Sequence, residues 1–143
     1  MLTTTALLNT TILIAISGLH VYWSFGGQWG MAVALPELPH RPGAKAFMPG
    51  PILTLMVAAG LTAMAGLHLA KLGWLPLPLS EKWLRYSLLA VGGIFFLRAI
   101  GDFRYVGFFK PITDSAFAKM DTVYYVPLCL VLSINAFWTA VGV

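Results

Sequence analysis

Arg98, Asp102 and Tyr105 are the residues of this sequence best suited to chemistry, because they end or directly follow a hydrophobic segment. A charged side chain inside a bilayer costs about 2.5–3.5 kcal/mol on insertion scales, so such residues are usually paired or functional. On a continuous helix the three would share one stripe, and Arg98 and Asp102 would be spaced to form an ion pair. Two interpretations remain open. Either the pair only neutralises charge, or the Asp102 carboxylate lies near Tyr105 and His20 for proton transfer or for holding a cation.

His20 lies near the end of the first hydrophobic segment and is the second candidate, as a general base or as a ligand of haem or a metal. A haem held by two histidines would need His68, and the helical rise puts the two residues at depths that differ by roughly 16 Å. The one Glu-x-x-His, from Glu37 to His40, lies in a proline-rich loop rather than on a helix. We therefore expect neither a metal nor a cofactor.

Further polar and aromatic residues near the same helix ends are candidates for binding a ligand. Asp121 is also placed to cap the start of the fourth hydrophobic segment, and Tyr125 suits a membrane interface. The catalytic candidates are His20, Asp102 and Tyr105, and the ligand-binding candidates are Arg98, Arg104, Tyr22, Trp23, Asp121 and Tyr125.

Four long hydrophobic stretches must position these residues. The chain has 143 residues, of which 59 % are hydrophobic and 10 % are charged. Soluble domains carry about 25 % charged residues, so a soluble enzyme is excluded. About 20 apolar residues cross a bilayer, which predicts spans at about 5–25, 51–72, 85–106 and 121–143. The sequence therefore predicts one all-α domain over residues 1–143, an antiparallel bundle of four transmembrane helices with both termini on the same side.

The third span is unusual because its uninterrupted apolar stretch, Tyr86 to Leu97, is short. About 12 residues rise roughly 18 Å as a helix, whereas the hydrocarbon core is about 30 Å thick. We therefore expect this helix to continue to about Val106 and to carry Arg98, Asp102 and Arg104 with it.

Polar residues form a stripe on three of the predicted helices. Because unpaired polar groups in lipid are costly, the stripes should face one another and enclose a polar interior that opens toward one membrane face. The stripes comprise Asn9, Ser17, His20 and Ser24 in the first span, Arg98, Asp102 and Tyr105 in the third, and Asp121, Tyr125, Asn135 and Thr139 in the fourth.

The charge pattern excludes other classes. The net charge is +4, but no basic run interleaved with aromatic residues suggests a nucleic-acid surface, so we expect no nucleic-acid partner. Residues 1–36 have no charged side chain, which favours a first membrane helix over a signal peptide. The single cysteine, Cys129, allows no disulfide within the chain.

Four blocks of the sequence together resemble an uncharacterised family of small bacterial four-helix integral membrane proteins, a domain of unknown function. The resemblance covers nearly the whole chain. It implies a compact four-span fold in the bacterial inner (cytoplasmic) membrane and supplies no activity. The blocks are residues 20–27 (HVYWSFGG), 101–109 (GDFRYVGFF), 117–121 (FAKMD) and 125–128 (YVPL).

The sequence leaves three functions open and does not decide whether the protein is an enzyme. In the first, the protein binds or processes a small lipophilic molecule in a polar pocket inside the helix bundle, by broad architectural analogy with small membrane isomerases. In the second, it is an accessory or structural subunit of a larger respiratory or photosynthetic membrane complex. The third, ranked last, is a small-solute carrier. The expected partners are membrane lipids, a lipophilic small molecule, and a protein partner in a membrane complex.

Overall fold

The protein is mostly helical, with four helical segments long and apolar enough to cross a membrane. The computed structural model describes residues 1–142. The all-α fold expected from the sequence is confirmed. The long helices are α1 (Leu2–Ser24), α3 (Pro51–Lys71), α4 (Glu81–Ile100) and α6 (Val126–Val141). The short helix α5 (Ala116–Met120) and a π-helical turn, η1 (Asp121–Tyr125), lead directly into α6.

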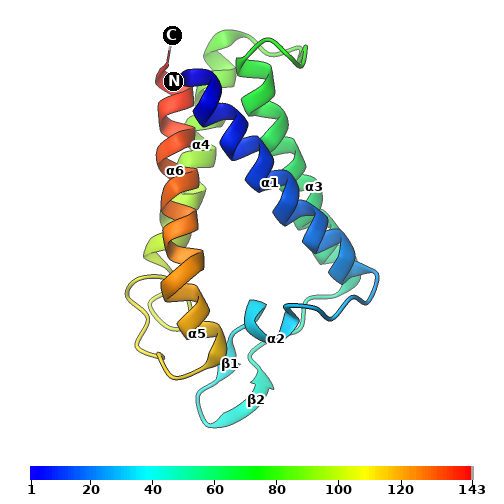
Figure 1. Ribbon diagram of the computed structural model, residues 1–143, viewed down its shortest axis with the longest axis vertical. Coiled ribbons are helices and arrows are strands. Elements are labelled where there is room, and N and C mark those ends of the chain that lie inside the picture. The colour runs from blue at the N-terminus through cyan, green and yellow to red at the C-terminus, as the bar shows by residue number, and fades with distance from the viewer. Residues whose placement is uncertain (143) are drawn as a thin grey trace.

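The long helices form two pairs. Helix α1 packs along α3, and α4 packs along α6. The pairs meet at the end that holds both chain termini and diverge toward the other end (Figure 1). The expectation that the two termini share one side is therefore confirmed. Buried apolar residues from all four long helices fill the interior, including Leu13, Leu61, Phe95 and Leu132.

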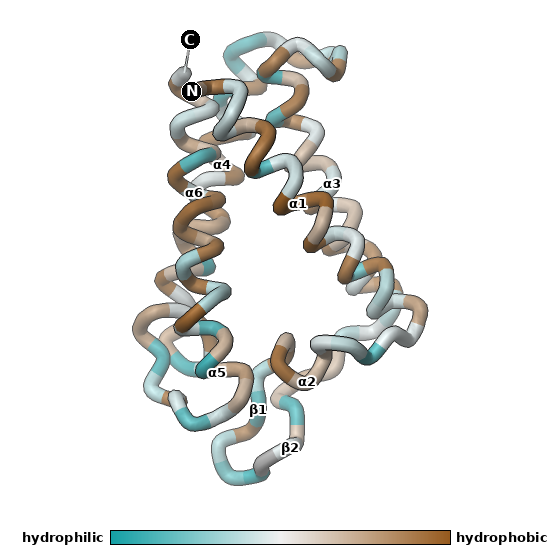
Figure 2. The backbone as a smooth tube through the Cα atoms, viewed as in Figure 1, coloured by the Kyte–Doolittle hydropathy of each residue, from teal (hydrophilic) through white to brown (hydrophobic). Residues whose placement is uncertain are grey.

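The segment between α1 and α3, where the sequence predicts a proline-rich loop, is structured. It contains the short helix α2 (Met31–Ala34) and a hairpin of β1 (Glu37–Leu38) and β2 (Arg41–Lys45). The Lys45 ammonium donates to the carbonyl oxygens of Ala32 and Leu35 and pairs with Glu37 at 3.2 Å. The segment lies between the diverging helix pairs, and Figure 2 shows it as more hydrophilic than the long helices.

The expected continuation of the third span to Val106 is wrong, because α4 ends at Ile100. The helix reaches membrane length by beginning earlier than expected, at Glu81, where the Ser80 hydroxyl accepts from the Trp83 N–H. Its 20 residues rise about 30 Å, which matches the hydrocarbon core. The chain then turns at Gly101, whose φ of +94° lies in the left-handed region that favours glycine. Consequently the residues from Asp102 onward do not continue the stripe that begins at Arg98.

Helices α4 and α6 approach closely at Gly92. A Cβ at this position would lie 2.6 Å from the Phe137 ring, and the Ser133 hydroxyl donates to the Gly92 carbonyl oxygen at 2.8 Å. At the adjacent Gly93 no atom beyond the neighbouring residues and the helix's own backbone lies within 4 Å of the corresponding position. Small residues often allow such close packing between membrane helices.

This difference gives a matched pair of variants. We expect Gly92→Ala to lower the free energy of unfolding by about 1–3 kcal/mol, because overpacking forces the Phe137 ring to move away from α4. We expect Gly93→Ala to be neutral or to stabilise by up to about 1 kcal/mol, since alanine favours helix. Reversible unfolding in mixed detergent micelles measures both. Equal effects of the two variants would contradict the packing described.

Candidate functional site

The polar stripes of the helices are divided among separate clusters rather than joined in one polar interior. The cluster nearest the termini centres on Asn9, which is fully buried. Its Nδ2 donates to the Leu132 carbonyl oxygen at 2.9 Å and to His68 Nε2 at 3.1 Å, and its Oδ1 accepts from Asn135 Nδ2 at 3.1 Å. His68 Nδ1 donates to the Met64 carbonyl oxygen at 2.8 Å, which fixes the neutral tautomer that accepts from Asn9. These groups satisfy one another, so the cluster holds α1, α3 and α6 together.

A smaller polar contact joins α1 to α3 farther along the pair. The Ser17 hydroxyl lies 2.8 Å from the Ala58 carbonyl oxygen, to which it donates, and 2.9 Å from the Thr62 hydroxyl. Ser17 is buried, and the hydroxyl pair satisfies its hydrogen-bonding capacity. The contact leaves no polar group here for a ligand.

At the other end of the molecule, Asp121 is the centre of a buried ionic cluster. Its Oδ1 accepts from Arg98 Nη2 at 2.8 Å, and its Oδ2 lies 3.0 Å from Lys110 Nζ and accepts from the Gly107 N–H at 2.8 Å. Asp121 is fully buried, and Lys110 Nζ also donates to the Thr122 hydroxyl at 2.7 Å. The cluster therefore joins α4, the loop after it and the turn η1. Within residues 1–142, Arg98 Nη1 is the one buried side-chain nitrogen or oxygen without a hydrogen-bond partner.

These contacts correct two expectations. Arg98 pairs with Asp121 and not with Asp102, because α4 ends before Asp102 and the turn carries that residue off the helix. Asp121 is not an N-cap; the cap of α5 is Ser115, whose hydroxyl accepts from the Ala118 N–H at 3.0 Å. Lys110, a member of the cluster, is not among the site residues predicted from the sequence. The signal was a lysine among aromatic and proline residues, next to Phe109 and Pro111.

Asp102 is exposed and organises the loop after α4. Its Oδ1 accepts from the backbone N–H groups of Arg104, Tyr105 and Val106 at 2.9, 2.7 and 2.9 Å. Partial burial alone would raise the pKa of this carboxyl, but hydrogen bonds from Val106, Arg104, Tyr105 and its own N–H together lower the pKa below its usual value. The Arg104 guanidinium lies over the Tyr105 ring, 5.1 Å from its centroid. Asp102, Arg104 and Tyr105 thus belong to one loop, on a different helix pair from His20.

His20 lies on the α1–α3 side, close to the structured segment after α1. Its Nδ1 is 2.8 Å from the Ile16 carbonyl oxygen, to which it donates, and its ring meets the Trp23 ring edge-on at 5.1 Å between centroids. Both rings line a cavity of about 310 Å³ between the end of α1, helix α2 and the start of α3. The remaining lining residues are Met31, Ala34, Leu35, Phe47, Pro49, Leu53, Thr54 and Val57. We refer to this as the His20 cavity.

The side-chain donors of Trp23 and Thr54, which line the His20 cavity, are already engaged. The Trp23 N–H donates to the Trp29 carbonyl oxygen at 2.8 Å, and the Thr54 hydroxyl donates to the Gly50 carbonyl oxygen at 3.0 Å. Because a carbonyl oxygen cannot donate, His20 Nδ1 carries the proton in the neutral ring and Nε2 has a lone pair. Among the described residues no donor reaches Nε2. The cavity therefore suits an apolar molecule whose one polar group is a hydrogen-bond donor.

The other two expected ligand-binding residues have structural contacts in this region. The Tyr22 ring packs against Gly27, and its hydroxyl accepts from the Trp29 N–H at 3.4 Å. The Tyr125 hydroxyl donates to the Val33 carbonyl oxygen at 3.1 Å, which ties the turn η1 to helix α2. The structure thus brings His20 together with Trp23, and Arg98 with Asp121, but it does not bring the two groups into one site.

Comparison with known proteins identifies a family, but no activity is known for that family. A family model described as "Protein of unknown function (DUF3995)" matches residues 13–136. The match confirms the resemblance to an uncharacterised family. No curated protein and no solved structure matches the chain.

Proposed function

Because the chain belongs to the DUF3995 family, whose function is unknown, we propose a function from its own structure: the protein binds a small lipophilic molecule that carries a hydrogen-bond donor. The binding site is the His20 cavity. The observation that carries this proposal is an apolar cavity of about 310 Å³ whose single ionisable lining residue, His20, presents an unpartnered acceptor among the described residues. This replaces a site shared by His20, Asp102 and Arg98.

The walls of the cavity favour an apolar ligand. Eight of its ten lining residues are apolar or aromatic, and specific small-molecule sites typically combine such walls with a few polar groups. The cavity lies between helices of membrane length, so that a ligand dissolved in lipid could reach it. A volume of about 310 Å³ is at the small end for ligand sites, which favours a ring or a short isoprenoid chain.

Because His20 Nε2 is an acceptor, it favours ligands that carry a hydrogen-bond donor. A hydroxyl or N–H group of the ligand would donate to Nε2, whereas an ether or a carbonyl would place two acceptors against each other. A ligand that leaves a buried polar atom unpaired loses about 1–3 kcal/mol. We therefore propose an alcohol, a phenol or an amine of lipophilic character as the ligand class.

The experiment compares farnesol with its methyl ether, which keeps the chain and removes the donor. We expect the wild type to bind farnesol about tenfold more tightly than the ether, because the lost hydrogen bond is worth about 1.4 kcal/mol. In His20→Phe, which keeps an aromatic ring in the cavity, this preference should disappear. Native mass spectrometry of the protein in detergent micelles measures both affinities.

His40→Phe is the matched control, because His40 is an exposed histidine in the β1–β2 hairpin region. This variant should retain the preference for farnesol. Equal binding of farnesol and its ether by the wild type, or an unchanged preference in His20→Phe, would refute the proposed site.

A second candidate function is an accessory subunit of a larger membrane complex. The observation that favours it is a group of exposed aromatic rings in the loop after α4, where Phe103 stacks on Phe109 with centroids 6.0 Å apart. Phe108 adjoins them and is 72 % exposed. A second membrane protein that copurifies in fixed stoichiometry from mild detergent would favour this function. For either function we propose the bacterial cytoplasmic membrane as the location, which the resemblance to small bacterial membrane proteins supports.

A further inference from the structure

A second pocket is lined by residues of α3, α4 and α6, and none of them lines the His20 cavity. The parts of these helices that line it lie at the end of the molecule that holds the termini (Figure 1). The pocket has a volume of about 570 Å³ and is bounded by the end of α3, the first turns of α4 and the end of α6. Its polar lining consists of Lys71, Glu81, Lys82, Arg85 and Tyr86. We propose that this pocket binds a phosphate-bearing anion, supplied by an anionic phospholipid headgroup or by soluble phosphate.

The charge of the lining favours an anion. Lys71, Lys82 and Arg85 are three cations, and Glu81 is the single acid among the lining residues, which leaves a net charge of +2. Glu81 is already engaged, because it pairs with Lys71. Both residues line the pocket, where the Lys71 side chain is 11 % exposed and the Glu81 side chain is 70 % exposed. Lys82 and Arg85 therefore supply the charge that the pair does not neutralise.

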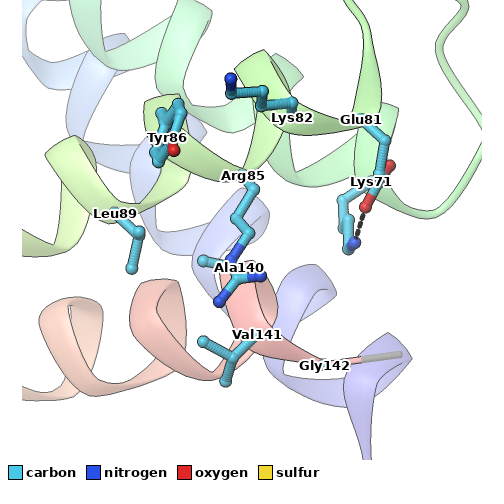
Figure 3. A pocket seen from close by; sticks show the side chains of 9 residues that line it. All are labelled: Lys71, Glu81, Lys82, Arg85, Tyr86, Leu89, Ala140, Val141 and Gly142. Atoms are coloured by element: carbon cyan, nitrogen blue, oxygen red, sulfur yellow. Dashed lines mark hydrogen bonds and ion pairs between the residues drawn. The ribbon is translucent and has the colours of Figure 1, made fainter.

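Arg85 is the residue best placed to hold the anion. In Figure 3 its side chain extends from α4 toward Ala140 and Val141 on α6, between the Lys71–Glu81 pair and Tyr86. A guanidinium can bind two phosphate oxygens at once, and it remains charged at any physiological pH. Among residues 1–142 no ion pair includes Arg85.

The apolar lining residues of the pocket are suited to contact the acyl chains of a phospholipid whose phosphate is bound there. Leu89, Ala140 and Val141 contribute apolar side chains to the lining of the pocket. The neighbouring Trp74 and Trp83 are more than half exposed, as is typical of residues at the level of lipid headgroups. A basic residue near an anionic membrane surface contributes about 1 kcal/mol of attraction.

Arg85 has one other role that the geometry allows. Its side chain reaches from α4 to the C-terminal end of α6, where the helix dipole attracts a cation. This attraction would stabilise the fold without any ligand. Loss of this role would lower thermal stability and leave the lipid preference unchanged, so the two roles give different results.

The experiment uses the full-length protein and a double variant, Lys82→Gln with Arg85→Gln. Native mass spectrometry measures the binding of phosphatidylglycerol and of phosphatidylcholine, each alone and with inorganic phosphate added, and a thermal scan measures stability. We expect the wild type to prefer phosphatidylglycerol and the double variant to bind it at least about tenfold more weakly. The control, Arg41→Gln with Lys119→Gln, removes two exposed cations from the other end and should bind as the wild type does.

The measurements with added inorganic phosphate distinguish a lipid headgroup from a soluble anion as the ligand. Binding of phosphatidylglycerol that resists inorganic phosphate supports a lipid headgroup, and displacement by inorganic phosphate supports a soluble anion in the same site. Equal binding of the two lipids by the wild type overturns the proposal. So does an unchanged preference in the double variant, whether or not its thermal stability falls.

Discussion

Replacing Asp121 by alanine is expected to lower the free energy of unfolding by about 3–5 kcal/mol, the usual cost of breaking a buried ion pair. The carboxylate is fully buried and compensates two cations, Arg98 at 2.8 Å and Lys110 at 3.0 Å. Without it, Lys110 would keep a charge at a buried position with only neutral partners. The change is measured by reversible unfolding in mixed detergent micelles, followed by helix content.

Asp114 provides the control for this substitution. It lies in the loop just before α5 and is exposed, and its carboxylate makes no ion pair among the described residues. Asp114→Ala should change the free energy of unfolding by no more than about 0.5 kcal/mol, as exposed substitutions usually do. If Asp121→Ala behaves like Asp114→Ala, the ionic cluster does not stabilise the fold.

Alanine at Gly101 or Gly107 is expected to cost at least about 3 kcal/mol, more than a strained backbone alone. Both glycines have φ near +90°. A Cβ at Gly101 would lie 1.7 Å from the Val106 carbonyl oxygen, and a Cβ at Gly107 would lie 2.4 Å from the Gly101 Cα. The loop would have to open, and the Gly107 N–H would move away from Asp121. The same unfolding measurement tests both variants.

Gly26→Ala is the control that distinguishes backbone strain from a steric clash of the added Cβ. The φ of Gly26 is +89°, but no atom outside Gly26 and its two chain neighbours lies within 4 Å of the position that a Cβ would take. Gly26→Ala should therefore cost only the strain, about 1–2 kcal/mol. Losses of the same size at Gly26, Gly101 and Gly107 would show that the close approach of the loop does not matter.

The helices could be predicted from the sequence because hydrophobic length is a property of each segment alone. The ends of α4 show the limit of that reasoning. The apolar pattern places the start of this span at about residue 85, yet the helix begins at Glu81, because charged side chains at the membrane interface are compatible with helix. The start was therefore placed too late, and the stop was placed too late as well. Gly101 could signal a helix end, but its φ became certain only with the structure.

The pairing of polar groups could not be predicted, because it depends on which helices are neighbours. The stripe on the first span was identified correctly as a set of polar residues, yet Asn9 and Ser17 bind α3 and α6 groups and leave none for α4. His20 was identified as a candidate from its residue type. Its apolar surroundings come from α2 and the residues before α3, whose fold is stabilised by the contacts of Lys45 rather than by any periodic pattern.

The divergence of the two helix pairs has a consequence for the surrounding lipid. Where α1–α3 and α4–α6 separate, the protein is wider than at the end where they meet (Figure 1). Set across a bilayer, this wedge takes up more area in one leaflet than in the other. The protein should accordingly concentrate where membrane curvature expands the leaflet that contains its wide end.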